Sequence, residues 1–189
     1  MKSKTIGAAA VAAAFAAAIA ASCATQAHAA PAHATQAHAT PAHTGKTHLL
    51  VWSVNSDGPR FRALVTGAVG DYGPGTTVLP DGQVDPEHSS ELELTLSHGS
   101  FRLNIATIHQ DIIKAFGHWQ SNATCSGSIS FTAQAPVVAG SGTGAYRGIT
   151  GSFSMKVSID EVDVKPACDG TGQFASQLIL MDGSGNVSY

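Results

Sequence analysis

The stretch "GSGTGAYRGITGSF", Gly140 to Phe153, places five glycines around a single Tyr-Arg pair. Such a stretch either binds phosphate or forms turns between strands. A P-loop needs G-x-x-x-x-G-K-[ST], and this stretch has no Lys. A dinucleotide-binding loop needs Gly-x-Gly-x-x-Gly, but Arg147 stands where the third glycine should be. With strand-like sequence on both sides, the glycines predict turns and close backbone contacts at one end of a β-sheet.

Apolar residues alternate with polar ones over most of residues 47–182, which is the period of a half-buried strand. The clearest hairpin is "ELELTLSHGSFRLNIA", residues 91–106, with Glu91 and Glu93 on its solvent face. Only residues 108–119 suggest a short helix, and Gly183 to Gly185 suggest a last turn. About eight strands with glycine-rich turns predict an all-β, closed antiparallel β-barrel, because closure removes exposed edges.

Composition indicates one globular domain with some processing sequence. The chain has 189 residues, 43% hydrophobic and 12% charged, with a formal net charge of −3. An acidic balance argues against a nucleic-acid surface, which needs clustered Lys and Arg. No motif for a cofactor is present in the sequence.

Residues 1–29 are typical of a signal peptide. Lys2 and Lys4 precede a small apolar run at residues 6–21, and "AHA" allows cleavage after Ala29. The run is too short and too Ala-rich for a retained membrane span. We therefore expect a secreted protein; the alternative is a lipoprotein anchored through Cys23.

A repeat follows the leader. "ATQAHAAPAH" and "ATQAHATPAH" occupy residues 24–43, so that histidines recur every five residues, at His28, His33, His38, His43 and His48. This period fits neither helix nor strand, and residues 30–46 are predicted to be a flexible linker before a barrel domain at residues 47–189. His33, His38, His43 and His48 are weak candidates for binding Zn or Cu, but without Cys or carboxylate partners a spacer is the preferred interpretation.

Two cysteines remain after the leader, Cys125 and Cys168. They lack the Cys-x-x-Cys spacing of a redox motif, and a metal site would need further ligands. A structural disulfide is predicted, in keeping with an oxidising compartment.

The glycine stretch resembles the Gly-Thr-Gly-aromatic-x-Gly-x-x-Gly segment of the allene oxide cyclase and dirigent-like barrel superfamily, especially its small exported bacterial members. "ALVTGAVGDYGPGTTV" at residues 63–78 and "LTLSHGSFRL" at residues 94–103 are similar to that group's early strands. The resemblance covers most of residues 50–187. It implies a closed barrel of about eight strands, often trimeric in the plant proteins, with an apolar cavity. The polar residues that guide reactive substrates in those proteins match no motif in this chain, and a fold alone does not imply a function.

Candidate site residues are few. If the strand through Ile105 continued, His109 and Asp111 would face the barrel interior as an acid/base pair. The preferred interpretation is that the strand ends near Thr107 and both side chains lie in solvent. Asp160, Glu161 and Asp163 lack the spacing of a calcium loop and are expected to form a solubilising turn. Three aromatic residues are expected in the core: Trp52, Trp119 and Tyr146.

Two functions remain open at this point. One is an exported barrel that binds a small hydrophobic molecule, or a partner surface, without catalysis. The other is a cyclase or isomerase that moulds a reactive hydrophobic substrate in the cavity, which needs few catalytic residues. Both predict a continuous internal cavity of roughly 300 Å³ or more, lined by apolar groups with one or two buried ionisable residues. The resemblance also suggests a homo-oligomer.

Overall fold

The computed structural model describes residues 43–54, 60–85, 88–119, 123–166, 168 and 173–189. The predicted signal peptide, Cys23, His33 and His38 lie outside these residues. By internal contacts the chain divides into residues 1–38 and 39–189, and the fold below is that of the second unit.

Eight antiparallel strands form one sheet, which confirms the all-β prediction. They are β1 (Thr44–Val54), β2 (Arg60–Gly67), β3 (Asp71–Val78), β4 (Glu91–Leu96), β5 (Gly99–Asn104), β6 (Ser126–Pro136), β7 (Thr150–Asp163) and β8 (Phe174–Ser188). The order across the sheet is β5-β4-β3-β2-β1-β8-β7-β6. The first five strands form one meander and the last three another, and β1 pairs with β8 to join them.

The core lies on the concave face of this sheet. Alternation places Ala63 and Val65 of β2, and Phe153, Met155 and Val157 of β7, on that face, all buried. The predicted hairpin contributes a further buried group from both its strands: Leu92, Leu94, Leu96, Phe101 and Leu103. Each such side chain contributes about 1.5–3 kcal/mol when fully buried.

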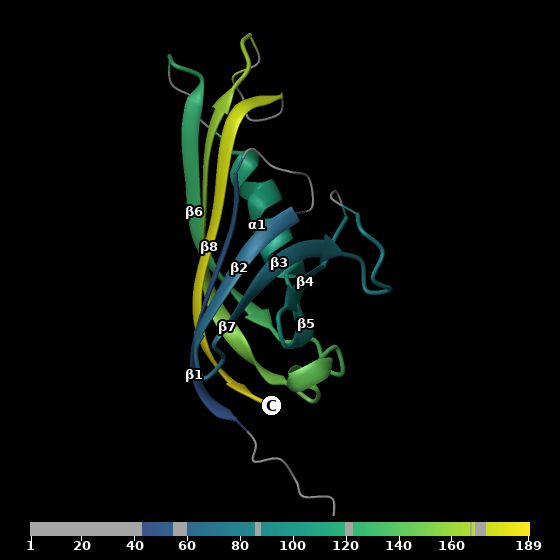
Figure 1. Cartoon of the computed structure of the whole chain (residues 1–189). Coiled ribbons are helices and arrows are strands. Elements are labelled where there is room, and N and C mark those ends of the chain that lie inside the picture. The colour runs from purple at the N-terminus through teal and green to yellow at the C-terminus, as the bar shows by residue number, and fades with distance from the viewer. Residues whose placement is uncertain (1–42, 55–59, 86–87, 120–122, 167, 169–172) are drawn as a thin grey trace, which may run out of the picture. The chain divides into compact units, whose positions relative to one another are not determined.

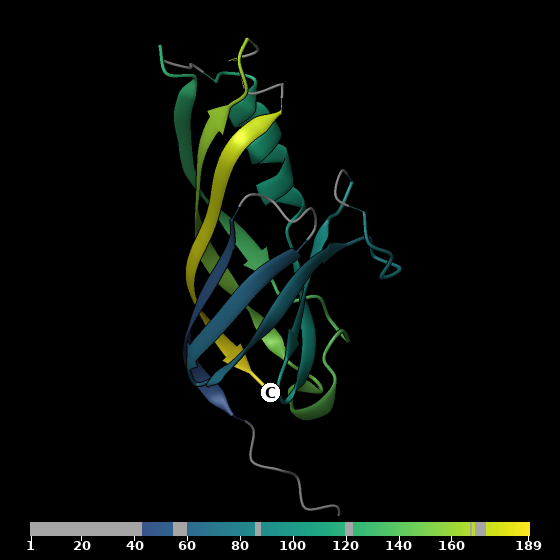
Figure 2. The same ribbon diagram turned by 45° about the horizontal axis from the view of Figure 1, so that its top comes forward.

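The sheet is strongly curled but open, so the prediction of a closed barrel is wrong (Figures 1 and 2). Strands β5 and β6 are the two edges and share no ladder. The edge β5 has only six residues whereas β6 has eleven, so β5 is too short to pair along the length of β6. Different segments close the gap between β5 and β6 at the two ends of β6.

At the lower end, the segment after β6 lies along the β5 edge. Val137 bridges Leu103, and the amides of Val138, Thr143 and Ala145 donate to the carbonyls of Arg102, Ser100 and His98. The side chains of Ser141 and Thr143 accept from the amides of Arg102 and Ser100, at 3.0 and 2.9 Å. The glycine stretch therefore forms hydrogen bonds with backbone groups of the edge strand β5 that would otherwise be exposed.

Two of its glycines make this approach possible. Gly144 begins the 3₁₀ turn Gly144–Tyr146 with φ of +56°, and a Cβ there would collide with the carbonyl oxygen of His98. At Gly142, a Cβ would collide with the carbonyl of Tyr146. The stretch thus has the role predicted for it, as a set of turns and close contacts at one end of the sheet.

Two parts of the last meander run longer than predicted. Gly183 and Gly185 do not form a turn, because β8 continues through them to Ser188. They lie on the concave side, where Cβ atoms would collide with the Met155 side chain and the Ser152 carbonyl of β7. The solubilising turn expected at residues 160–163 is instead the end of β7, with Glu161 and Asp163 buried.

Toward the other end, helix α1 (Ala106–Phe116) packs against the concave side (Figures 1 and 2). Ile108, Ile112 and Phe116 share one face of this helix, and Ile105 precedes its first turn. Ile108 is buried, and Ile112 and Phe116 pack on the core cluster. Lys114 lies in the last turn, where a cation is favoured, and pairs with Asp111 at 3.1 Å.

Cys125 and Cys168 are disulfide-bonded, as predicted, with their Cα atoms 4.8 Å apart. The bond ties the start of β6 to the connection between β7 and β8. Within the described part of the chain, no helix has the length and apolar character required to cross a membrane.

Candidate functional site

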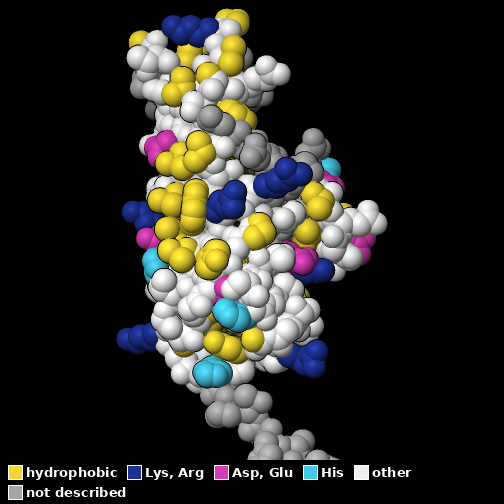
Figure 3. Space-filling model, in the orientation of Figure 1, with side chains coloured by type: hydrophobic (Ala, Val, Ile, Leu, Met, Phe, Trp, Pro, Cys, Tyr) yellow, Lys and Arg dark blue, Asp and Glu magenta, His cyan; other side chains and the backbone are white. Residues whose placement is uncertain are grey.

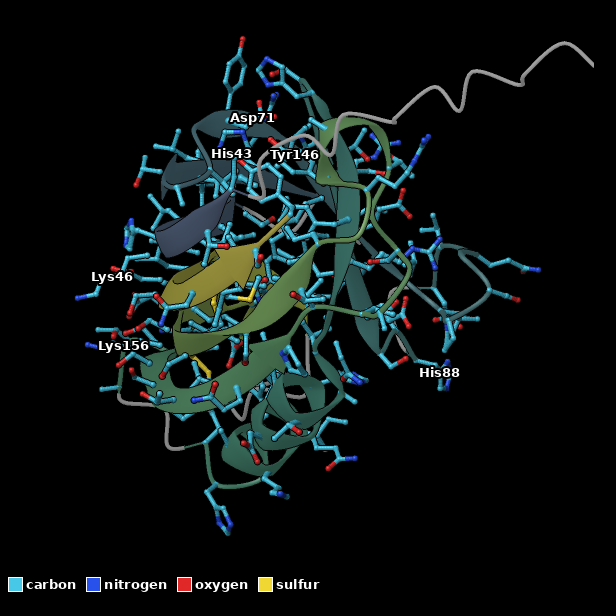
Figure 4. The ribbon with its side chains drawn as sticks, turned by 90° about the horizontal axis from the view of Figure 1, so that it is seen from below. His43, Lys46, Asp71, His88, Tyr146 and Lys156 are labelled. Atoms are coloured by element: carbon cyan, nitrogen blue, oxygen red, sulfur yellow. A yellow bond between two sulfur atoms is a disulfide. The ribbon has the colours of Figure 1, made fainter. Side chains whose placement is uncertain are left out.

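A buried carboxylate, Asp71, organises the lower end of the sheet (Figure 4). It begins β3 and accepts six hydrogen bonds from three segments of the chain. Tyr146 Oη donates to Oδ2 at 2.5 Å, and the Tyr72 amide donates to Oδ1 at 2.7 Å. The β4–β5 turn supplies the Ser97 hydroxyl, the Ser97 and His98 amides at 3.1 Å each, and His98 Nδ1 at 3.0 Å.

This environment fixes the charge on Asp71. Burial acts to raise its pKa, but the hydrogen bonds from Ser97, Tyr146, Tyr72 and His98 outweigh burial and hold the pKa well below its usual range. Burial and the adjacent Asp71 carboxylate raise the pKa of Tyr146, so its hydroxyl remains a donor. With both oxygens saturated by donors, Asp71 acts as an anchor for the fold rather than as a base.

His98 is the part of this cluster that meets solvent, with 66% of its side chain exposed. Asp71 orients its ring through Nδ1, as in the acid/base pairs of many enzymes. His98 does not line the pocket beneath α1 that is described next. The Asp71 cluster and that pocket are therefore separate parts of the molecule.

A pocket of about 290 Å³ lies between α1 and the concave face of the sheet. Strands β2, β3, β7 and β8 line one side and α1 the other. Most of the lining is apolar: Phe61, Ile105, Ile108, Ile112, Phe116, Ile159, Ile179 and Met181. Thr77, Ser89, His109 and Gln177 are the polar residues. Its volume is close to the 300 Å³ expected as a minimum, but it lies between a helix and an open sheet rather than inside a closed barrel, and its ionisable residue His109 is half-buried.

Behind Gln177 lies a pair of buried carboxyl groups. The Gln177 side-chain amide donates to Glu161 Oε2, and Glu161 is hydrogen-bonded to Asp163. Burial raises the pKa of Glu161, and Asp163 raises it further, while the bond from Gln177 opposes the shift. Burial beside a second acid disfavours the ionised form of Glu161, and Gln177 connects the pair to the pocket wall.

The two predicted catalytic candidates separate in the structure. The strand ends before residue 106, so the strand that would have made them a pair does not exist. His109 nevertheless lines the pocket, because it lies three residues before Ile112 and so shares the inner face of α1. Asp111 lies elsewhere on the helix, paired with Lys114. Their proposed acid/base pairing is therefore not formed.

The described histidines of the repeat are engaged in other contacts. His43 stacks on Tyr189, with ring centroids 5.3 Å apart, and His48 Nε2 is 2.7 Å from Asp182. Across the described residues, no group of three or more His, Cys, Asp or Glu side chains is placed to hold a metal ion.

The solvent face predicted for the β4–β5 hairpin is also partly covered. Glu91 is buried, and Arg102 pairs with it at 3.3 Å and with Glu93 at 3.2 Å. Arg102 further donates to the Pro80 carbonyl, so the loop after β3 is held over this face. These acids stabilise the hairpin and lie outside the pocket.

Sequence reasoning missed Asp71, Glu161 and Gln177. Each is a single polar residue in or next to an alternating strand, and its partners come from distant segments. Continued alternation along β7 was the one available signal, because it extends from Ile159 to positions 161 and 163 on the same face.

Comparison of the chain with protein-family models, curated proteins and solved structures finds no match.

Proposed function

We propose that this protein is an exported carrier that binds a small, largely apolar molecule in the pocket between α1 and the sheet, without catalysing a reaction. The pocket carries this proposal: eight apolar side chains surround a volume of about 290 Å³, and the polar residues are few. That volume is at the lower end of the range for ligand sites, which favours a compact molecule. The Cys125–Cys168 disulfide supports a place outside the cytoplasm.

The polar residues of the pocket suggest what the ligand carries. Gln177 donates its side-chain amide to Glu161 and places a polar group in the pocket wall. His109 offers a ring nitrogen from the opposite wall. A hydroxyl or carbonyl group on an otherwise apolar molecule would complement these residues.

An isomerase or cyclase is the second candidate, in line with the resemblance to the allene oxide cyclase and dirigent-like superfamily. One observation favours it: His109, a side chain suited to proton transfer near neutral pH, lines an apolar pocket. Against it, no carboxylate is among the described pocket-lining residues to orient that ring.

Native mass spectrometry of the protein purified from its own host tests the carrier function. We expect a bound molecule that organic solvent releases. Its binding site is then tested with 1-aminoanthracene, a compact apolar fluorescent probe that the released molecule should displace. Ile112→Phe narrows the pocket and should weaken probe binding at least tenfold.

Ile113→Phe is the matched control, because Ile113 is the next residue of α1 and is 60% exposed. It should bind the probe like the wild type. Equal binding by both variants would contradict the assigned site. Conversion of the released molecule into an isomer of the same mass, lost in His109→Gln with binding retained, would instead establish the isomerase.

A further inference from the structure

The convex face of the sheet carries an apolar surface that the pocket does not explain. Among the described residues, eight large hydrophobic side chains are exposed, and five of them point outward from strands: Val54, Leu64, Tyr72, Val162 and Leu178. Half-buried Leu50, Trp52 and Leu180 lie between them on β1 and β8. Figure 3 shows apolar side chains gathered over this face. Trp52, expected in the core, belongs to this outer surface.

The strand register orders these residues into rows across the sheet. Trp52 lies beside Arg62 on β2 and Leu180 on β8, and Leu180 lies beside Ser158 on β7. In the next row, Val54 lies beside Leu178, and Leu178 beside Asp160. Arg60 is two residues from Arg62 along β2 and reaches the level of that second row. The centre of the face is thus an apolar ridge on β1 and β8.

Hollows of opposite charge flank this ridge. One, of about 500 Å³, is lined by Trp52, Val54, Pro74 and the two arginines Arg60 and Arg62. The other, of about 620 Å³, is lined by Val54, Leu178, Val162 and the carboxylate of Asp160. A ridge between a basic and an acidic hollow is complementary to a copy of itself turned by 180°.

We propose that this face binds a second copy of the chain through a two-fold axis that runs parallel to β1 and β8, midway between them. This axis places β1 of each copy over β8 of the other, so that Trp52 and Val54 meet Leu180 and Leu178. It also places β2 of each copy over β7 of the other at the same level. Arg60 of each copy then meets Asp160 of the other, which gives two equivalent ion pairs. Two sheets packed face to face lie about 10 Å apart, which is the spacing expected at the axis, between β1 and β8. The convex faces diverge toward β2 and β7, so the Arg60–Asp160 contact depends on the length of the arginine side chain.

The lower rows are more polar. Leu50 and Leu64 come opposite Asp182 and Lys156 of the second copy by the same register. Asp182 is already bound to His48, and the Lys156 stem can lie across Leu64. The apolar centre of the interface is therefore formed by the two upper rows.

Charge exchange tests this geometry directly. Within one copy, β2 and β7 are separated by β1 and β8, so the backbones at Arg60 and Asp160 lie about 14 Å apart and the two side chains cannot pair. We expect the full chain to sediment as a dimer at tens of micromolar. Arg60→Asp and Asp160→Arg should each weaken dimerisation at least tenfold, and the double variant should restore it.

Arg147→Asp is the control, since this exposed arginine follows the 3₁₀ turn and is far from the convex face in the fold. It should remain a dimer. Circular dichroism melting of each variant checks that it is folded. A wild-type monomer or trimer at these concentrations, or a double variant as weak as the single ones, would overturn the proposal.

Discussion

The two ends of the concave face solve the same problem in different ways. An open, curled sheet leaves a gap between its edge strands, where backbone groups and apolar side chains would meet water. The lower end closes this gap with backbone hydrogen bonds from residues 137–145 to β5. The upper end covers the concave face with α1 and leaves a pocket beneath it.

Their buried acids differ in the same way. Asp71 is charged, because six donors surround it, and its pKa is lowered. Glu161 retains its proton to higher pH than usual, because burial and Asp163 raise its pKa. Hydrogen-bond saturation makes Asp71 a rigid anchor, whereas the surroundings of Glu161, beside the apolar pocket, disfavour its ionised form. We therefore expect stability to reside at the lower end and binding at the upper end.

Asp71→Asn should cause the largest loss of stability, because it removes the anchor of the lower end. The substitution keeps the shape but removes the charge that six donors surround, and directs amide hydrogens at some of those donors. We expect a loss of about 4 kcal/mol in the free energy of unfolding, as for a broken buried charge interaction. Urea denaturation measures this loss. Asp182→Asn, at an exposed carboxylate bound to His48, should change stability little, and equal losses in both variants would refute the anchor role.

Gly144→Val should destabilise the lower end by about 3 kcal/mol. A β-branched residue is strained at φ of +56°, and its Cβ would push the turn off the His98 carbonyl. We expect a reduced yield of folded, exported protein and a lower melting temperature. Gly140→Ala is the control for backbone strain alone, since Gly140 has φ of +75° with open space around it. A normal melting curve for Gly144→Val would show that the β5 edge is not held by this turn.

Tyr146→Phe isolates one of the bonds to Asp71. Loss of a hydroxyl donor to a buried carboxylate should cost about 2 kcal/mol at pH 7. Because the folded pKa of Asp71 is depressed, its contribution is present above the unfolded pKa of about 4 and is lost as pH falls. The variant should therefore lose less stability than the wild type between pH 5 and pH 2. If the wild type and Tyr146→Phe lost stability equally as the pH falls, the proposed link between Tyr146 and the pKa of Asp71 would be contradicted.

Much of the sheet could be predicted because its signals are local. Period-two alternation located Ala63 and Val65, or Phe153 and Met155, on the buried face without any tertiary information. The two cysteines could be paired by elimination. Gly144 and its neighbours identified turns, because a positive φ and close backbone contacts favour glycine.

The features that could not be predicted from the sequence depend on distant parts of the chain. Closure requires edge strands of comparable length, and β5 ends at Asn104 because a helix begins at Ala106. Asp71 derives its role from Ser97 and Tyr146, which are 26 and 75 residues away. Glu161 was predicted in a solvated turn, since the polar residues around it do not reveal that β7 continues to Asp163.

Glu161→Gln should change the free energy of unfolding less than the other substitutions, and it should increase stability rather than decrease it. The folded pKa of Glu161 is raised, so the contribution of this residue to stability is fully present below the unfolded pKa of about 4.3 and is lost as pH rises through the folded pKa. Gln imitates the protonated acid: its carbonyl can accept from Gln177 and its amide can donate to Asp163. We expect a gain of about 1 kcal/mol at pH 8 and almost none at pH 4, measured as urea midpoints across this range. A variant less stable than the wild type at pH 8 would show that the ionised carboxylate contributes favourably to the upper end, as Asp71 does below. The contrast between the two ends would then concern packing alone and not charge.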